Sequence, residues 1–156
     1  MRYCSRAPYR IGLAGGGTDV SPYSDIYGGG ILNATVSMYA SAEIEPLDGG
    51  RVIFSEPSTG LYEECDAAME LPAQGAFALH KGVYNRKVRD YAHRPLSLRI
   101  TTTPEVPSGS GLGTSSTMMV AIVGAFAEAL GLPLGGYDIA WLAYCIERRD
   151  LGMAGG

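Results

Sequence analysis

The first half of the chain consists of short runs in which apolar and polar residues alternate, a pattern typical of β-strands with one buried face. This pattern predicts strands over residues 2–13, 31–44 and 51–55, and a fourth near 61–65. Glycine-containing turns separate the runs. Residues 48–50 read D-G-G, so we predict that the second and third runs pair as a hairpin around this turn.

A short helix is predicted between the first two strands. Ser21 is a favoured N-cap residue, and Pro22 suits the first helical position. The glycines at 28–30 should end this helix, because glycine destabilises helical backbone.

The second half of the chain is dominated by helical spacing of its apolar residues. Such spacing covers residues 77–91 and 138–151, and residues 114–130 are apolar on nearly every face, which indicates a buried helix. One further strand is predicted over residues 96–103. Because most strands precede most helices, we predict a single α+β domain over residues 1–156, with helices packed on one face of a mostly antiparallel or mixed sheet.

The composition supports a packed domain and argues against two classes of partner. Hydrophobic residues make up 46% of the 156 residues and charged residues 18%, with a formal charge of −4. No basic stripe is present to neutralise phosphates, so we expect no nucleic-acid partner. The longest apolar stretch, residues 118–130, contains Glu128 and is too short to cross a bilayer, so we expect no membrane partner.

The cysteines and the N-terminal residues indicate in which cellular compartment the protein is expected. Cys4, Cys65 and Cys145 are widely spaced and form no CxxC pair, so we expect reduced, buried thiols and neither a disulfide framework nor a zinc site. The first ten residues lack the apolar core of a secretory signal. We therefore expect a cytoplasmic protein, and nothing in the pattern specifies an oligomeric state.

A glycine-rich segment lies between a predicted strand and the buried helix, with the sequence P-S-G-S-G-L-G-T-S-S-T over residues 107–117. Glycines let successive backbone N–H groups converge, and a helix N-terminus adds partial positive charge, so this segment is suited to phosphate. The candidate phosphate-binding residues are Pro107, Gly109, Ser110, Gly111, Leu112, Gly113, Thr114, Ser115 and Ser116. The simpler alternative is a glycine-rich turn capped by a serine or threonine.

The spacing of this loop differs from two common nucleotide-binding motifs. It contains neither G-x-x-x-x-G-K-[ST] nor G-x-G-x-x-G. Instead, P-x-x-x-G-L-G-[ST]-S followed by a helix resembles the second motif of the GHMP kinases (galactokinase, homoserine kinase, mevalonate kinase and phosphomevalonate kinase). The resemblance implies a ribosomal protein S5 domain 2-like N-terminal domain whose loop wraps the phosphates of ATP, with Mg²⁺ as cofactor.

Residues 6–19, R-A-P-Y-R-I-G-L-A-G-G-G-T-D, resemble the first motif of the same family, which shapes the sugar pocket. Gly16 and Gly17 stand where galactokinases carry a glutamate-histidine pair, which argues against galactose. The triple-glycine version, together with residues 27–35, is similar to the D-glycero-D-manno-heptose 7-phosphate kinases, which phosphorylate the anomeric hydroxyl of a heptose 7-phosphate. The alternatives are a kinase for another sugar, such as fucose or mannose, and a non-catalytic sugar or nucleotide sensor.

The residue types of the first motif suit a sugar and its reacting hydroxyl. Asp19 could accept hydrogen bonds from two sugar hydroxyls, and Arg10 could orient the reacting hydroxyl or stabilise charge on the transferred group. The substrate-binding candidates are Gly16, Gly17, Thr18 and Asp19, and the catalytic candidate is Arg10. The alternatives are Asp19 as a turn or helix cap and Arg10 as a surface residue of a strand.

Glu147 stands near the end of the last predicted helix. The resemblance implies that Glu147 and Ser115 share the magnesium that bridges the nucleotide phosphates. The alternative is an exposed glutamate beside Arg148 and Arg149. In the family a catalytic aspartate would follow a stretch like Gly155-Gly156, so the resemblance covers the front half of a family member, and we expect this chain to turn over poorly by itself.

Four basic residues lie on the predicted helix over 77–91. They are Lys81, Arg86, Lys87 and Arg89. We expect a solvated helix face, and the alternative is a site for the phosphate of an incoming sugar phosphate.

Overall fold

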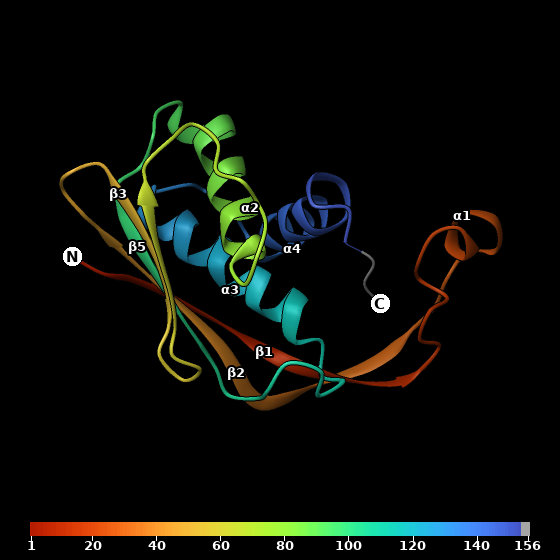
Figure 1. Ribbon diagram of the computed structural model, residues 1–156. Helices are drawn as coiled ribbons and strands as arrows, with labels where there is room; N and C mark the ends of the chain where they lie inside the picture. Colours follow the sequence, from red (N-terminus) through yellow and green to blue (C-terminus); the bar gives the residue numbers. More distant parts are fainter. Residues whose placement is uncertain (154–156) are drawn as a thin grey trace.

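The computed structural model describes residues 1–153 and has a five-stranded sheet at its centre (Figure 1). The strands are β1 (Tyr3–Ala14), β2 (Leu32–Pro46), β3 (Arg51–Glu56), β4 (Leu61–Asp66) and β5 (Leu98–Pro104). Their order in the sheet is β1-β2-β5-β3-β4. The pair β3 and β5 is parallel, and the other neighbouring pairs are antiparallel, so the sheet is mixed but mostly antiparallel.

The predicted hairpin at residues 48–50 is wrong, because β5 lies between β2 and β3. Leu98 at the start of β5 is opposite Pro46 of β2 on one side and opposite Val52 of β3 on the other. Leu98 and Ile100 are 5% and 0% exposed. The face of β5 that carries these two residues is buried, and a position inside the sheet also pairs both edges of the strand. The sequence of a turn reflects only local backbone preferences, so it does not indicate that a distant strand lies between the two strands that the turn connects.

Helices cover one face of the sheet, as predicted. They are α2 (Ala78–Lys87), α3 (Thr114–Ala129) and α4 (Gly136–Cys145). A π-helical turn follows α2 (η1, Val88–Ala92) and another follows α4 (η2, Ile146–Asp150). Figure 1 shows the three helices together on one side, with α3 against β1 and β2, and the short α1 (Tyr23–Tyr27) at the far end of the long β1–β2 ribbon.

The core forms where α3 packs on the sheet. Met119, Ile122 and Phe126 of α3 are all 0% exposed, in agreement with the predicted buried helix. Gly124 allows α3 to approach β1 closely, since a Cβ atom there would lie 2.4 Å from the Ser5 hydroxyl oxygen. This packing fixes α3 against β1, the two elements that carry the candidate motifs. In the part of the chain that the structure describes, no helix is both long enough and apolar enough to span a lipid bilayer.

The predicted cap of the short helix is wrong. Pro22, not Ser21, occupies the N-cap position of α1, and no side chain caps this helix. The Ser21 hydroxyl instead donates to the Asp25 carboxylate at 2.5 Å. A hydroxyl that bonds a nearby side chain is not available to the helix N–H groups.

The three thiols are free, but they differ in exposure. Cys145 is buried and Cys65 is half-buried, whereas Cys4 is exposed, so its predicted burial is wrong. Side chains alternate across β1, and Ala7 and Tyr9 are the ones that face the helices. Cys4 belongs to the opposite set, which faces away from the core.

His80 of α2 makes the stability of the fold depend on pH. Its ring is 5% exposed and packs edge-on against Phe54 and Phe77, and Nε2 hydrogen-bonds the Thr102 hydroxyl at 3.0 Å. Burial lowers the pKa of His80 from 6.5 to about 4. The unfolded chain therefore binds a proton between these values that the folded chain does not. We expect the free energy of unfolding to fall by about 2–3 kcal/mol between pH 7 and pH 4.5, measured by urea denaturation.

His93 provides the matched control for this prediction, because it is exposed and the chain has only two histidines. His93→Asn should keep the pH dependence, since asparagine tolerates the left-handed conformation at this position (φ +53°). His80→Gln should flatten it. An equally steep pH dependence in His80→Gln would show that another group is responsible.

Candidate functional site

Residues 107–113 form an irregular loop that leads into α3. Gly109, Gly111 and Gly113 have φ values of +82°, +76° and +72°, in the left-handed region that favours glycine. Gly113 is the N-cap of α3, and no side chain caps the helix. The alternative of a turn capped by serine or threonine is therefore wrong. The uncapped N–H groups of the first turn, with the helix dipole, suit an anion.

Glu147 of η2 lies at the start of α3. Its side chain is buried, with 6% of the residue exposed. The Ser115 hydroxyl donates to Oε1 at 3.0 Å, and the Ser116 hydroxyl donates to Oε2 at 2.8 Å. The structure thus brings together the two residues expected to share a metal. The alternative of an exposed surface glutamate is wrong.

The donor set around Glu147 suits Mg²⁺ that arrives with a nucleotide. One carboxylate and two hydroxyls supply only oxygen atoms, which Mg²⁺ prefers. Among residues 1–153 no group of three or more His, Cys, Asp or Glu side chains could hold a metal ion. A magnesium ion here would therefore need phosphate oxygens and water to complete its shell, which is how Mg²⁺ commonly binds beside phosphates.

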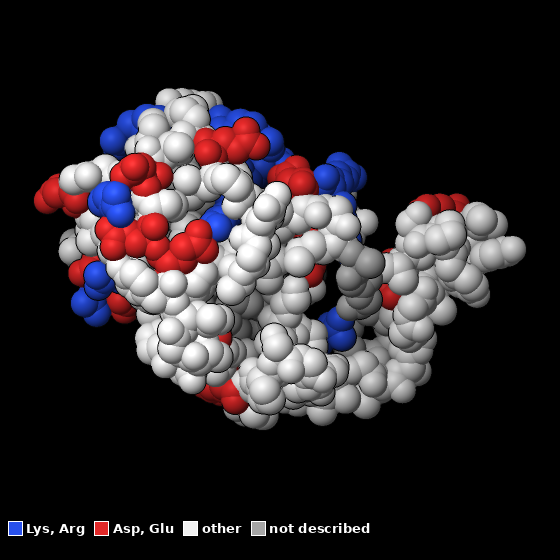
Figure 2. All heavy atoms as spheres, viewed as in Figure 1, with Lys and Arg blue, Asp and Glu red and all other residues white. Residues whose placement is uncertain are grey.

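A cleft joins the two candidate motifs. A cavity of about 200 Å³ is lined by Arg10, Asp19, Ile31, Ser116, Val120, Ala140, Ala143, Tyr144, Glu147 and Arg148. A smaller hollow of about 40 Å³ shares Arg10, Asp19 and Ile31 and adds Gly12, Ala14, Gly16, Gly17, Leu32 and Asn33. Figure 2 shows the molecule hollowed between its helical body and the arm that ends in α1. Asp19 and Glu147 therefore face one space, although 127 residues lie between them in the sequence.

Arg10 links β1 to the glycine loop. Its backbone N–H donates to the Leu112 carbonyl at 3.3 Å. A Cβ atom on Gly113 would lie 3.4 Å from the Arg10 Cζ, so the guanidinium lies against the last glycine of the loop. Arg10 is half-buried and lines both hollows of the cleft, which rules out the alternative of a surface strand residue.

Thr18 holds the first glycine turn in shape. Its hydroxyl is 2.7 Å from the Gly15 carbonyl and 3.1 Å from the Gly30 carbonyl, and the Gly30 N–H donates to it at 3.2 Å. A Cβ atom on Gly15 would lie 2.0 Å from the Gly30 oxygen, so the two glycine segments pack backbone to backbone. Thr18 lines neither hollow but presents Asp19, which does. Asp19 does not cap α1, since no side chain does.

The basic residues of α2 and η1 lie outside this cleft. Lys81 pairs with Glu63 at 2.6 Å and is buried. Lys87 is 0% exposed, with Nζ 4.7 Å from the centre of the Tyr91 ring, and burial lowers the pKa of Lys87 to about 8. The expected solvated face is therefore wrong for both lysines, because their aliphatic stems and charges are covered by packed neighbours. Arg86 and Arg89 pair with acidic residues of the π-helical turns.

Sequence reasoning missed the apolar wall of the cleft and one cation. These residues are Ile31, Val120, Ala140, Ala143, Tyr144 and Arg148. Tyr144 precedes Glu147 by three residues, a spacing that places two side chains on neighbouring positions of a helix, and this was the available signal. Ile31 had none. The predicted boundary at Gly155-Gly156 lies outside the described residues.

Comparisons with known proteins agree with this geometry. The family model described as GHMP kinases N terminal domain matches residues 78–156. The D-glycero-alpha-D-manno-heptose 7-phosphate kinase of Campylobacter jejuni is 49% identical over 152 residues, which are 97% of this chain and 45% of that protein. The crystal structure of a D-glycero-D-manno-heptose 1-phosphate kinase from Bacteroides thetaiotaomicron matches with a TM-score of 0.92 and 52% identity, over 100% of this chain and 51% of the other.

More distant structures share the fold alone. The mevalonate kinase of Methanococcus jannaschii matches with a TM-score of 0.81 at 17% identity, over 99% of this chain and 49% of that one. The chain thus spans about half the length of each of these three relatives. Its loop, its cleft and these matches agree, and the chain belongs to the GHMP kinases, with the fold of their N-terminal domain.

Proposed function

We propose that this chain is the nucleotide-binding domain of a sugar kinase that uses ATP and Mg²⁺, and that its sugar is D-glycero-D-manno-heptose 7-phosphate. One observation carries the proposal: Asp19 of the sugar motif and Glu147 with Ser116 beside the glycine loop line the same cavity. Phosphoryl transfer needs the two substrates side by side, and this cleft is shared by both motifs. The names of the Campylobacter and Bacteroides relatives favour a heptose over fucose or mannose.

On the nucleotide side, the backbone of residues 107–114 would cradle the triphosphate at the N-terminus of α3. Thr114, Ser115 and Ser116 would add hydroxyl donors to the phosphate oxygens. Glu147 and Ser115 would hold Mg²⁺ on the phosphates, where the ion neutralises negative charge. The hydroxyls of Ser115 and Ser116 already contact the Glu147 carboxylate, so the three groups that would meet the metal and the phosphates lie together at the start of α3.

On the sugar side, Asp19 would accept hydrogen bonds from sugar hydroxyls. Gly16 and Gly17 line the smaller hollow beside it and face open space, since a Cβ atom on either would meet nothing within 4 Å. In the transfer, the anomeric oxygen would bond to the γ-phosphorus, the bond between that phosphorus and the bridging ADP oxygen would break, and the proton of the hydroxyl would pass to water. Arg10 lies between the two sides, against Gly113. Its guanidinium would orient the reacting hydroxyl and stabilise charge on the transferred group.

Ser115→Ala tests the nucleotide assignment. We expect about fivefold weaker binding of Mg²⁺-ATP by isothermal titration calorimetry, the effect of losing one hydroxyl contact. The melting temperature should hardly change, because Ser115 is exposed. Ser58→Ala is the matched control, a serine in an exposed turn outside the cleft. Equal ATP affinity in Ser115→Ala and the unsubstituted chain would contradict the assignment.

Titration with heptose 7-phosphate, fucose and mannose tests the sugar assignment. We expect the heptose phosphate to bind with the highest affinity, and preference for either neutral sugar would replace the heptose in the proposal.

We also propose a cytoplasmic location, supported by the free thiols of Cys4, Cys65 and Cys145, since free thiols are typical of reducing compartments.

A further inference from the structure

Glu147 is carried by a π-helical turn and not by an ordinary α-helical one. In η2 the Leu151 N–H donates to the Ile146 carbonyl at 2.9 Å, five residues back. A π-helical turn holds one more residue than an α-helical turn, so it changes the direction of the side chains that follow. Such single turns are rare and occur frequently at functional sites. Tertiary contacts must therefore hold η2 in this conformation.

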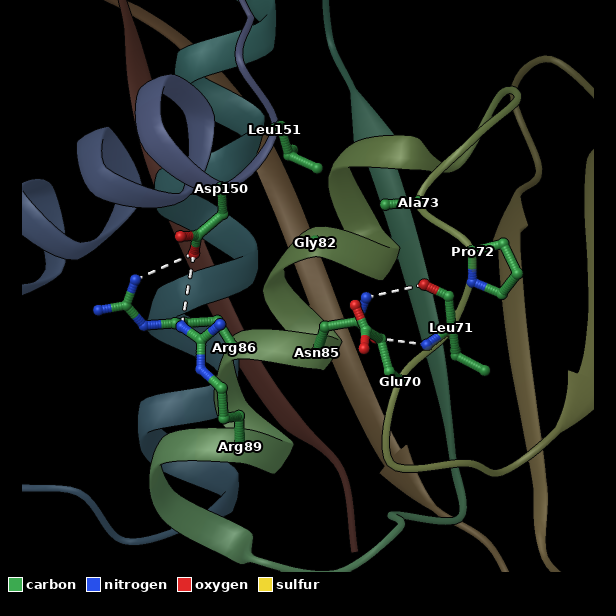
Figure 3. Close-up of a pocket in the computed structure, with 10 residues that line it drawn as sticks. All are labelled: Glu70, Leu71, Pro72, Ala73, Gly82, Asn85, Arg86, Arg89, Asp150 and Leu151. Carbon is green, nitrogen blue, oxygen red and sulfur yellow. Dashed lines mark hydrogen bonds and ion pairs between the residues drawn. The ribbon is translucent and has the colours of Figure 1, made fainter.

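Two contacts fasten the end of η2 to α2. The Arg86 Nη1 donates to the Asp150 carboxylate at 2.9 Å. Leu151 packs on Gly82, where a Cβ atom would lie 2.8 Å from Leu151 Cδ1. Figure 3 shows Asp150 directed toward Arg86 and Arg89, with Leu151 above the α2 segment that contains Gly82. Glu147 and Asp150 of the same turn thus contact different helices, α3 and α2.

The ion pairs extend from η2 to the π-helical turn at the end of α2. Asp90 of η1 accepts from both Arg86 and Arg89, and Asp150 lies 3.9 Å from the Arg89 guanidinium. The side chains of Arg86 and Asp150 are only 23% and 27% exposed. Such pairs are less screened by water and salt than fully exposed ones. The two π-helical turns are therefore bridged by charge.

The cavity beside these residues has a volume of about 490 Å³, but several of its polar groups are bound to one another. Asn85 of α2 accepts from the Leu71 N–H at 2.7 Å and donates to the Leu71 carbonyl at 2.8 Å (Figure 3). Arg86 and Arg89 are bound to Asp150 and Asp90. The polar wall thus ties neighbouring segments to α2.

We propose that Arg86 and Asp150 are positioning residues for Glu147. Their ion pair, together with Leu151 on Gly82, holds η2 in the π-helical conformation in which the Glu147 carboxylate meets Ser115 and Ser116. The expected effect of the ion pair on Mg²⁺ binding rests on the proposed function. The expected effect on the conformation of η2 does not. Loosening the pair lets η2 relax toward α-helical hydrogen bonding and turns Glu147 away from the first turn of α3.

The test uses Asp150→Asn, with Arg86→Lys as the conservative variant and Arg51→Met as the matched control. Arg51 forms a comparable pair of ion contacts, with Glu64 and Asp66, at the far edge of the sheet. In Asp150→Asn we expect amide exchange over residues 146–151 to quicken about tenfold, as for loss of one charge-assisted contact. The gain in ATP affinity on adding Mg²⁺ should fall about tenfold. Affinity for metal-free ATP should not change. A general loss of structure would lower this affinity too, so the measurement separates the two causes.

The outcomes separate this inference from the proposed function. Arg86→Lys should lie between Asp150→Asn and the unsubstituted chain, and Arg51→Met should match the unsubstituted chain in both measurements. In one outcome, Mg²⁺ no longer raises the ATP affinity of Glu147→Gln, but it still raises that of Asp150→Asn, whose amide exchange over residues 146–151 also stays slow. The positioning inference is then wrong, and the proposed function stands. If the unsubstituted chain shows no Mg²⁺ gain, the proposed function fails, and amide exchange alone decides whether the ion pair holds η2.

Discussion

Glu147→Gln is expected to weaken binding of Mg²⁺-ATP about 100-fold, the equivalent of roughly 2–3 kcal/mol for loss of a charged contact. Glutamine has the same size and can still accept from one serine, so the fold around η2 should persist. It lacks the negative charge that Mg²⁺ requires from its one protein carboxylate here. Affinity for ATP in the presence of EDTA should therefore stay the same. Calorimetric titration with and without Mg²⁺ measures both values.

Glu128→Gln is the control for this substitution. Glu128 lies near the other end of α3 and is exposed, so its loss should leave both affinities unchanged. The metal assignment of Glu147 would be wrong if Glu147→Gln bound Mg²⁺-ATP as tightly as Glu128→Gln does.

Gly29→Ala is expected to lower affinity for heptose 7-phosphate by about 100-fold, because displacing Asp19 removes charge-assisted hydrogen bonds to the sugar that are worth roughly 2–3 kcal/mol. A Cβ atom at Gly29 would lie 2.2 Å from the Thr18 carbonyl oxygen and 2.9 Å from the Asp19 Cα. These are backbone atoms, so the segment that presents Asp19 must move. The core lies elsewhere, and ATP affinity and the melting temperature should change little.

Gly30→Ala is a control from the adjacent residue. A Cβ atom at Gly30 has nothing within 4 Å and the residue needs no left-handed backbone, so sugar affinity should be retained. Both binding constants are accessible by calorimetry, with thermal unfolding as the check on folding. Similar sugar affinity in the two variants would show that the position of Asp19 does not control binding.

The sequence predicted those parts of the fold that depend on neighbouring residues. Periodicity located the strands and the long buried helix, because burial of one face requires a regular spacing along the chain. It did not locate β5 between β2 and β3, since that choice depends on the burial of Leu98 and Ile100 against distant strands. It also did not distinguish π-helical from α-helical turns at 146–150, because the contacts of Asp150 and Leu151 with α2 are tertiary.

The candidate site divides in the same way. The glycine loop, Asp19 and Glu147 were identified from short motifs and family resemblance. The structure brings Asp19, Glu147 and Ser116 to one cleft, and the glycine loop leads into this cleft through the first turn of α3 but does not line it. Thr18 carried no sign that its hydroxyl would be used to hold the Gly15 and Gly30 backbone. The spacing of Tyr144 from Glu147 was a local signal for one side of the apolar wall. That Tyr144 meets Ile31 depends on how α4 and the start of β2 approach each other, which local spacing does not specify.

The central claim is that Asp19 and the first turn of α3, into which the glycine loop leads, border one cavity where the two substrates meet. A crystal structure of the chain with a non-hydrolysable ATP analogue, Mg²⁺ and heptose 7-phosphate tests it most directly. The γ-phosphate should lie at the first turn of α3 beside Ser115, with the sugar hydrogen-bonded to Asp19 and its anomeric oxygen facing that phosphate. A nucleotide or a sugar bound elsewhere on the molecule, with the cleft between Asp19 and Glu147 empty, would contradict the claim.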